Sequence, residues 1–220
     1  MIRLYDYVLS ASCYKVRLMA ALLGVKLEQV AVDFHPGQEQ RGLAFRRINP
    51  AGTLPVMLAG DLVLNESTAM LVYLARLAGR DWLGADTPEA GAQVQNWLAF
   101  SARLGGSLGM ARLHDMLLYP GDIDALRHAG HQCLREMEAH LTEQRYGGGI
   151  WLVGTAPSIA DIACFPAVAL SLDGGVTLDD YPSVRLWTRA VRALNRFIEM
   201  PGIHRLHELT PTPTAEDRAT

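Results

Sequence analysis

Short apolar runs alternate with amphipathic stretches in the N-terminal third of the chain. Residues 2–7 and 27–32 are strand-like, with apolar side chains at alternate positions. Between them, residues 13–23 repeat apolar side chains at helical spacing; Ser12 is the predicted N-cap and Gly24 the predicted stop. This order predicts two strands that pair in parallel through a helical crossover.

The next segments predict a short helix, a hairpin and a third helix. A helix is expected near residues 43–48, and residues 54–58 and 62–64 form two short strands around a Gly-containing turn. Residues 66–77 again show helical spacing, and Gly79 ends that pattern. The predicted element order up to this point is βαβαββα.

No strand pattern occurs after Gly79, and the spacing of apolar residues in the rest of the chain predicts helices. Ser158 and Asp161 have the spacing of a capping box that opens a buried helix. Gly105 and Gly106 weaken the helical pattern locally but do not end the long predicted helix that contains them. The predicted helices cover residues 90–114, 123–141, the stretch opening at Ser158, 184–194 and 202–209.

These patterns predict an α/β domain followed by an all-α domain. Pro88 suits the first turn of a helix, so a linker is expected before it. The Pro- and Thr-rich end of the chain is expected to be disordered. The predicted parts are a first domain over residues 1–79, a linker over 80–88, an all-helical domain over 89–209 and a tail over 210–220.

Composition narrows the function classes. The chain has 220 residues, half of them hydrophobic, and a net charge of −3 without a basic run, which argues against nucleic-acid binding. The most apolar stretch, residues 159–172, is too short for a membrane span and contains Asp161 and Pro166. Three scattered cysteines favour a reducing, cytoplasmic location. The pair His204 and His207 lacks further ligands, so no metal site is expected.

The most informative motif is Asn49-Pro50-Ala51-Gly52-Thr53-Leu54-Pro55-Val56, followed by Glu66-Ser67. Pro55 cannot donate to a central ladder, but it fits the lip of a sheet after a cis peptide bond. The backbone of Leu54 and Val56 would then face outward, ready to pair with an extended peptide. Glu66 and Ser67 begin a helix whose free N–H groups attract an anion. Together they predict a site for a small anionic peptide.

Ser10 and Ser12 lie where the first predicted strand leads into the first helix. Ligands bind beyond the carboxyl ends of strands in such sheets, so both hydroxyls are expected at the mouth of the site. No Gly-x-Ser-x-Gly elbow or neighbouring histidine activates either as a nucleophile, which favours the role of hydrogen-bond donor. Ser10-x-x-Cys13 is a dithiol motif without its first cysteine, so disulfide exchange is disfavoured.

These motifs together resemble the cytosolic glutathione S-transferases. The resemblance runs from Leu4 to about Ile203, and its motifs occur in the family's order. They are Ser10-x-Ser-Cys-Tyr-Lys-Val-Arg17, Asn49-Pro50-x-Gly-x-Leu-Pro-Val56, Glu66-Ser67 and Ser158-Ile-Ala-Asp161. The resemblance implies a thioredoxin-like first domain, an all-helical second domain, a homodimer, and glutathione as co-substrate without a metal.

The resemblance also implies roles for the residues of the glutathione site. Leu54 and Val56 beside Pro55 would hold the cysteinyl backbone, and Glu66 and Ser67 the γ-glutamyl end. Thr53 stands where relatives often carry Gln or Lys beside the glycine carboxylate. Three other residues are alternatives for that end: His35, Gln38 and Gln40.

The thiol-activating residue stays open between Ser10, which is preferred, and Ser12, with Tyr7 a distant third. The second substrate, a small electrophile, is expected between the Ser10 loop and the long helix. The candidate residues there are Phe100, Arg103, Leu104, Met110 and His114.

Three other functions stay open beside glutathione transfer. They are a zeta-like glutathione-dependent isomerase, whose consecutive serines are interrupted here by Ala11, a glutathione-dependent peroxidase, and a non-catalytic binding module.

Overall fold

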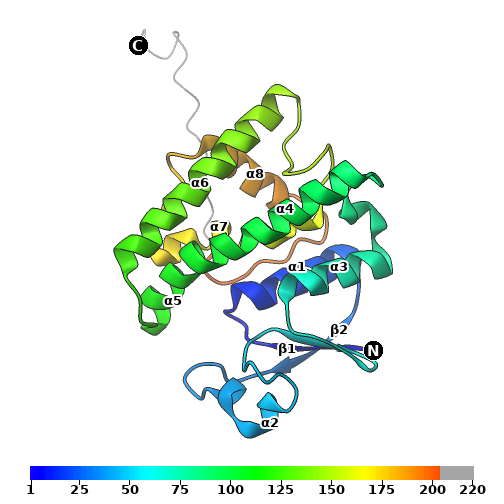
Figure 1. Ribbon diagram of the computed structural model, residues 1–220, viewed down its shortest axis with the longest axis vertical. Helices are drawn as coiled ribbons and strands as arrows, with labels where there is room; N and C mark the ends of the chain where they lie inside the picture. Colours follow the sequence, from blue (N-terminus) through cyan, green and yellow to red (C-terminus); the bar gives the residue numbers. More distant parts are fainter. Residues whose placement is uncertain (204–220) are drawn as a thin grey trace, which may run out of the picture.

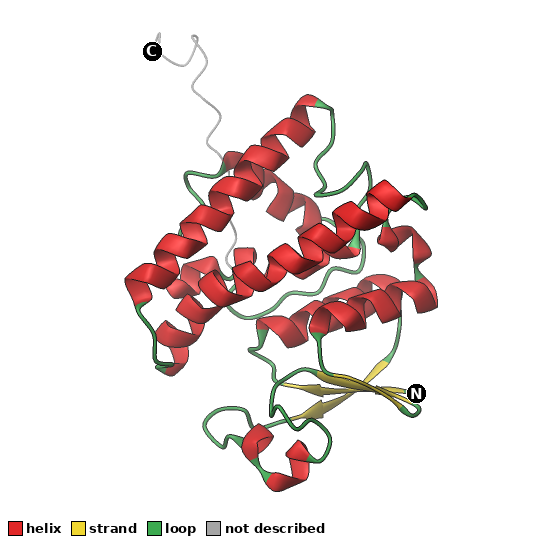
Figure 2. Cartoon of the chain, viewed as in Figure 1, coloured by secondary structure: helices red, strands yellow, loops and turns green. Residues whose placement is uncertain are grey.

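The structure is a computed structural model that describes residues 1–203. A four-stranded sheet lies at one end and a helical assembly at the other, with α1 (Ala11–Leu23) and α3 (Ser67–Ala78) between them (Figures 1 and 2). The tail at 210–220, His204 and His207, and nearly all of the helix predicted at 202–209 fall outside the described residues.

The sheet has the strand order β2-β1-β3-β4. β1 pairs in parallel with β2 and antiparallel with β3, and β3 pairs antiparallel with β4. The parallel pair and the hairpin are therefore as predicted from the sequence. The strands are β1 Ile2–Asp6, β2 Leu27–Ala31, β3 Val56–Ala59 and β4 Leu62–Leu64.

Two helices, α1 (Ala11–Leu23) and α3 (Ser67–Ala78), cover the face of the sheet that is turned toward the rest of the molecule. The N-cap of α1 is Ser10, whose Oγ accepts the N–H of Cys13 at 3.2 Å. The prediction that Ser12 caps this helix was wrong, since the helix begins two residues earlier. The short helix α2 (Leu43–Arg46) lies on the opposite face of the sheet (Figure 1).

The remaining described residues contain helices and no strand. A 3₁₀ turn at Arg80–Leu83 occupies part of the predicted linker, and Pro88 begins the next helix, as expected. The helices are α4 Pro88–Leu104, α5 Met110–Leu117, α6 Ile123–Tyr146, α7 Ile159–Ala169 and α8 Pro182–Arg192.

A π-helical segment, Gly105–Gly109, joins α4 to α5. The sequence predicted only a soft interruption here. A π turn is wider than an α turn, and such turns occur often at functional sites.

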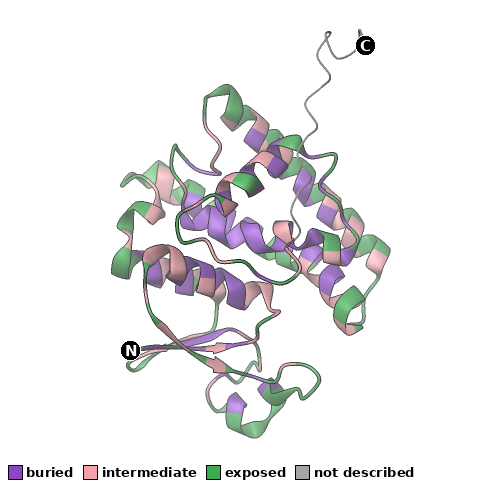
Figure 3. Cartoon of the chain, turned by 180° about the vertical axis from the view of Figure 1, so that it is seen from behind, coloured by how far each residue is buried: buried purple, intermediate pink, exposed green. Residues whose placement is uncertain are grey.

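Helix α7 lies at the centre of the molecule and is buried along nearly its whole length (Figure 3). Ser158 and Asp161 form the predicted capping box at its start. The Asp161 carboxylate also accepts the Leu152 N–H at 3.0 Å and the Trp187 indole N–H at 2.8 Å. One continuous hydrophobic core runs from the sheet through α1 and α3 to α7, so the two halves of the chain are packed against each other.

Candidate active site

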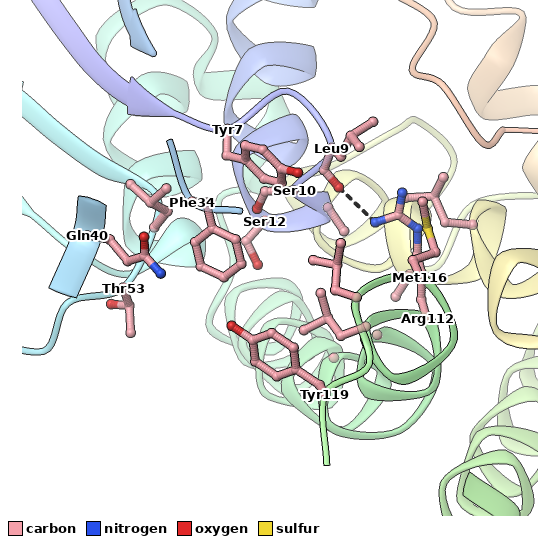
Figure 4. Close-up of a pocket in the computed structure, with 18 of the residues that line it drawn as sticks. Tyr7, Leu9, Ser10, Ser12, Phe34, Gln40, Thr53, Arg112, Met116 and Tyr119 are labelled. Atoms are coloured by element: carbon pink, nitrogen blue, oxygen red, sulfur yellow. Dashed lines mark hydrogen bonds between the residues drawn. The ribbon is translucent and has the colours of Figure 1, made fainter. Parts of the chain in front are cut away.

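A cavity of about 430 Å³ lies between the start of α1, the loops after β2 and before β3, and the face of α5 (Figure 4). Ligand pockets in proteins span roughly 300–1,000 Å³, so this volume suits a small molecule. Both halves of the chain contribute to the lining. The cavity therefore sits at the carboxyl end of β1, where the sequence predicted the site.

The two candidate hydroxyls, Ser10 and Ser12, both line this cavity. The Ser10 Oγ accepts a hydrogen bond from the Cys13 N–H, which leaves its own proton available to donate. The first-turn N–H groups of α1 have no partners within the helix, so this end carries positive potential. One wall of the cavity therefore carries both the hydroxyl donors and a helix N-terminus.

Arginines on two helices hold the loop that carries Ser10. Arg17 on α1 donates to the Val8 carbonyl at 2.8 Å and binds the Asp6 carboxylate. Arg112 on α5 donates to the Leu9 carbonyl at 2.7 Å, the bond drawn in Figure 4. Arg17 belongs to the motif that begins at Ser10, whereas no sequence signal pointed to Arg112.

The opposite wall comes from the loop before β3. The peptide bond between Leu54 and Pro55 is cis, as predicted, and Thr53 and Leu54 line the cavity. Pro55 and Val56 are buried below the lining and do not contribute to it.

Among the three alternatives for the glycine end of the peptide, the structure brings only Gln40 to the cavity. Gln40 is 2% exposed and its Oε1 has no hydrogen-bond partner. His35 and Gln38 are exposed and lie outside the lining. Arg46 and Arg41 also line the cavity.

Glu66 and Ser67 stand at the N-terminus of α3, with Glu66 as its N-cap residue. Neither is part of the cavity lining. Lys15 lines the cavity, and the charge of Glu66 acts on its ammonium group. Burial has the larger influence and lowers the pKa of that ammonium group.

Three aromatic rings are stacked at the cavity wall, from Tyr7 through Phe34 to Tyr119 (Figure 4). The ring centroids of Tyr7 and Phe34 are 5.3 Å apart, and those of Phe34 and Tyr119 are 6.4 Å apart with nearly parallel planes. Phe34 follows β2 and Tyr119 follows α5, so the stack joins the two halves of the chain. Periodicity could not reveal it, because all three rings belong to loops.

The α5 wall differs from the one predicted. Leu104 and Phe100 belong to the buried core, and Arg103 pairs with Glu136 at the surface. The residues that do line the cavity recur at regular helical spacing, so the predicted residues lay on a different face of the same helical stretch. The cavity lining therefore includes none of the five predicted residues Phe100, Arg103, Leu104, Met110 and His114; it includes Gly105, Leu108, Gly109, Arg112, Leu113 and Met116 instead.

Cys13 points into the core and is fully buried, as its helical position predicted. Burial raises the pKa of its thiol from 9.0 to about 12. A thiol in this state is a poor nucleophile at neutral pH, because only the thiolate reacts. Disulfide exchange at Cys13 is thus disfavoured by structure as well as by sequence.

No cluster of three or more His, Cys, Asp or Glu side chains that could hold a metal ion occurs among residues 1–203. Over the same residues, none of the helices combines the length and apolarity needed to cross a bilayer.

Two family models match the chain. The model of the glutathione S-transferase N-terminal domain matches residues 1–76, and that of the C-terminal domain matches residues 121–190.

Individual proteins match over most of their length. A maleylacetoacetate isomerase of Pseudomonas aeruginosa is 27% identical over 199 residues, which cover 83% of this chain and 87% of the isomerase. The crystal structure of a glutathione S-transferase from Pseudomonas fluorescens superposes with a TM-score of 0.81 at 30% identity, over 91% of this chain and 98% of that one. A glutathione S-transferase structure from Xanthobacter autotrophicus gives the same TM-score at 27% identity, over 92% and 98%.

Proposed function

The chain belongs to the glutathione S-transferase family, and on that premise we propose that it activates the glutathione thiol as a thiolate and adds it to a small electrophile. The observation that carries the proposal is the cavity itself. It combines two serine hydroxyls and a helix N-terminus on one wall with a largely apolar wall on the other. This pairing suits a sulfur anion beside an apolar reactant.

The energies fit this role. A free thiol has a pKa near 8.5, and lowering this pKa by two pH units requires the thiolate to be stabilised by about 2.7 kcal/mol. A hydrogen bond to a charged group contributes roughly 1.5–3 kcal/mol. A helix N-terminus adds roughly 0.3–1 kcal/mol. One hydroxyl at the start of α1 therefore supplies most of the stabilisation.

Glutathione is proposed to lie along the wall that faces α1. The Leu54 and Val56 backbone beside cis-Pro55 would hold its cysteinyl part, with Glu66 and Ser67 at the γ-glutamyl end. Gln40 suits the glycine end, since its unpartnered Oε1 would accept a hydrogen bond from the glycyl amide N–H. Thr53 and Arg46 line the same region and complete this end.

The second substrate is proposed to occupy the space between the Ser10 loop and α5. Leu108, Leu113 and Met116 make this wall apolar, and Phe34 and Tyr119 close its rim. An electrophile held here would face the sulfur without intervening protein atoms.

The test combines binding with turnover. Wild-type protein is titrated calorimetrically with S-methylglutathione, which binds but cannot react, and is assayed with glutathione and 1-chloro-2,4-dinitrobenzene across a panel of pH values. We expect saturable binding and a conjugation rate that rises with an apparent pKa below that of free glutathione. Absence of both binding and conjugation would refute the proposal.

Glutathione-dependent isomerisation is the second candidate, supported by the 27% identity to the isomerase of Pseudomonas aeruginosa over most of both chains. The two reactions differ in the fate of glutathione. A transferase consumes one thiol per product, whereas an isomerase returns it. Free thiol is therefore measured before and after complete turnover of an unsaturated diacid such as maleylacetone.

We also propose that the protein forms a homodimer. Leu62 and Val63 on β4 and Leu77 on α3 are large apolar side chains that are 41%, 50% and 56% exposed. Burial of such side chains is a common basis of subunit association. Sedimentation equilibrium tests the proposal, with Val63→Asp expected to shift the protein toward a monomer.

A further inference from the structure

Two buried side-chain atoms lack a hydrogen-bond partner among the described residues, and both belong to residues that line the cavity. One is the Oε1 atom of Gln40 and the other the Nη2 atom of Arg112. Buried polar groups in folded proteins are nearly always partnered, so such exceptions call for an explanation. A ligand in the cavity is the simplest source of both missing partners.

The guanidinium of Arg112 is otherwise firmly held. Its Nε donates to the Asp173 carboxylate at 2.9 Å, and its Nη1 donates to the Leu9 carbonyl at 2.7 Å. The side chain is only 5% exposed. These two contacts fix the plane of the guanidinium and leave the two N–H donors of Nη2 unused.

The surroundings of Arg112 in the lining are apolar. Leu113, Met116 and Leu170 contribute side chains that offer no hydrogen-bond acceptor. A buried N–H donor without an acceptor is unfavourable. Asp173 already pairs with the charge of the guanidinium, so what Nη2 lacks is an acceptor, and a carboxylate is the strongest one because charge assists the hydrogen bond.

Arg112 lies away from the proposed site of the glycine carboxylate of glutathione (Figure 4). Figure 4 shows Gln40 and Thr53 at one side of the cavity and Arg112 at the other, with Ser10 and Ser12 between them. The Leu9 carbonyl that Arg112 binds directly precedes Ser10. A group held by Arg112 is therefore close to the reacting sulfur and belongs to the second substrate.

We propose that Arg112 binds a carboxylate of the second substrate, so that the enzyme prefers electrophiles that carry a carboxylate over neutral ones of the same shape. This inference rests on the proposed function, since it assigns the second substrate to the α5 wall. It makes Arg112 a specificity-determining residue.

The first experiment needs no catalysis. Binding of 3,5-dinitrobenzoate and of its methyl ester is measured by calorimetry with saturating S-methylglutathione; neither probe has a leaving group. A charge-assisted hydrogen bond predicts that wild type binds the carboxylate roughly 10- to 100-fold tighter than the ester. Arg112→Gln is expected to abolish this preference, and Arg135→Gln, on the exposed side of α6, to keep it.

The second experiment compares kcat/KM for 4-chloro-3,5-dinitrobenzoate and for its methyl ester. For each variant, kcat/KM for the carboxylate is divided by kcat/KM for the ester. Dividing this ratio by the wild-type ratio cancels the different intrinsic reactivities of the two substrates. Arg112→Gln is expected to lower the ratio by roughly the same 10- to 100-fold. An equal loss for both substrates would instead assign Arg112 to positioning of the Leu9 loop and overturn the proposal.

The outcomes separate this inference from the proposed function. Failure to bind S-methylglutathione contradicts the proposed function, whereas the two dinitrobenzoyl probes still report on Arg112. A wild-type protein that binds the ester as tightly as the carboxylate overturns the inference, even if Arg112→Gln does not fold.

Discussion

Arg17 holds both carboxylate oxygens of Asp6, with its Nη1 atom 2.7 Å from Oδ1 and 2.6 Å from Oδ2. The two side chains are 10% and 9% exposed, so the pair is nearly removed from solvent. It joins the middle of α1 to the last residue of β1. Because Arg17 also binds the Val8 carbonyl, the same contact fixes the loop that leads to Ser10.

Arg17→Met should destabilise the protein by about 3–5 kcal/mol, because it leaves the Asp6 carboxylate buried without its partner. The double variant Asp6→Leu/Arg17→Met should be less destabilised than the single one, since no uncompensated charge remains. Urea unfolding measures both. Arg3→Met is the matched control: its pair with Glu28 is exposed, so a change within about 1 kcal/mol is expected. A double variant worse than the single one would contradict this account.

Ser10→Gly should raise the kinetic pKa of bound glutathione without unfolding α1. The substitution removes the hydroxyl, while glycine retains most of the N-cap stability at a cost of a few tenths of a kcal/mol. Ser12→Ala leaves the cap intact and removes the other candidate hydroxyl. The dependence of kcat/KM on pH identifies which substitution shifts the pKa. A shift only in Ser12→Ala would move the activating role to Ser12.

The elements of the fold were readable from the sequence where local signals were strong. The strand and helix order up to Gly79, the Pro88 helix start and the Ser158–Asp161 capping box all agree with the structure. Each depends on signals between residues close together in sequence, namely the alternation of apolar residues, helix caps and helix stops. The wrong cap, Ser12 in place of Ser10, arose because two serines two residues apart are both good caps.

The α5 wall could not be predicted, because its residues keep ordinary helical spacing and spacing alone does not say which face of a helix meets the sheet half of the chain. The π-helical segment Gly105–Gly109 was also missed, because no propensity rule converts three glycines in five residues into one wide turn. Arg112 and the stack of Phe34 on Tyr119 were missed for another reason. Their partners are distant in sequence, and only the packing of the helical half on the sheet brings them together.

Gly105→Leu should block bulky second substrates while leaving the fold and glutathione binding intact. Gly105 lines the cavity, has an ordinary helical backbone, and a Cβ there would meet no atom within 4 Å. Gly106→Leu is the matched control, because Gly106 has the same open surroundings but lies outside the lining. KM is measured for a small and a large electrophile in both variants. Equal effects of the two substitutions would show that Gly105 does not limit the site.

Asp161→Ala should be among the most destabilising single substitutions outside the cavity. It removes an acceptor that binds the Leu152 N–H, the Ser158 N–H and the Trp187 indole N–H at 2.8–3.0 Å, all in the buried core. Unpartnered buried donors cost roughly 1–3 kcal/mol each, so a loss of several kcal/mol is expected. Asp161→Asn keeps one acceptor oxygen and should lose less. Chemical denaturation of the two variants compares these losses, and similar, small values would contradict the assigned role.

The buried thiol of Cys13 should make the protein lose stability in alkali. Its pKa is raised by burial from 9.0 to about 12, so the folded state binds the proton more tightly than the unfolded state. The stabilisation is fully present below pH 9 and is lost as the pH rises toward 12. Because a difference of one in pKa corresponds to about 1.4 kcal/mol, the full effect is on the order of a few kcal/mol.

Cys13→Ala should therefore flatten the fall of the unfolding free energy between about pH 8 and about pH 10.5, measured by urea titration at each pH. Val16→Ala, which removes buried volume from the same helix without removing a titratable group, should lower stability equally at all these pH values. The slope left in Cys13→Ala is expected to come from Tyr14 and Cys164, whose pKa values burial also raises. If Cys13→Ala and wild type lose stability in parallel, the Cys13 thiol ionises with similar ease in the folded and unfolded chains. The argument against thiol exchange at this position would then lose its electrostatic support.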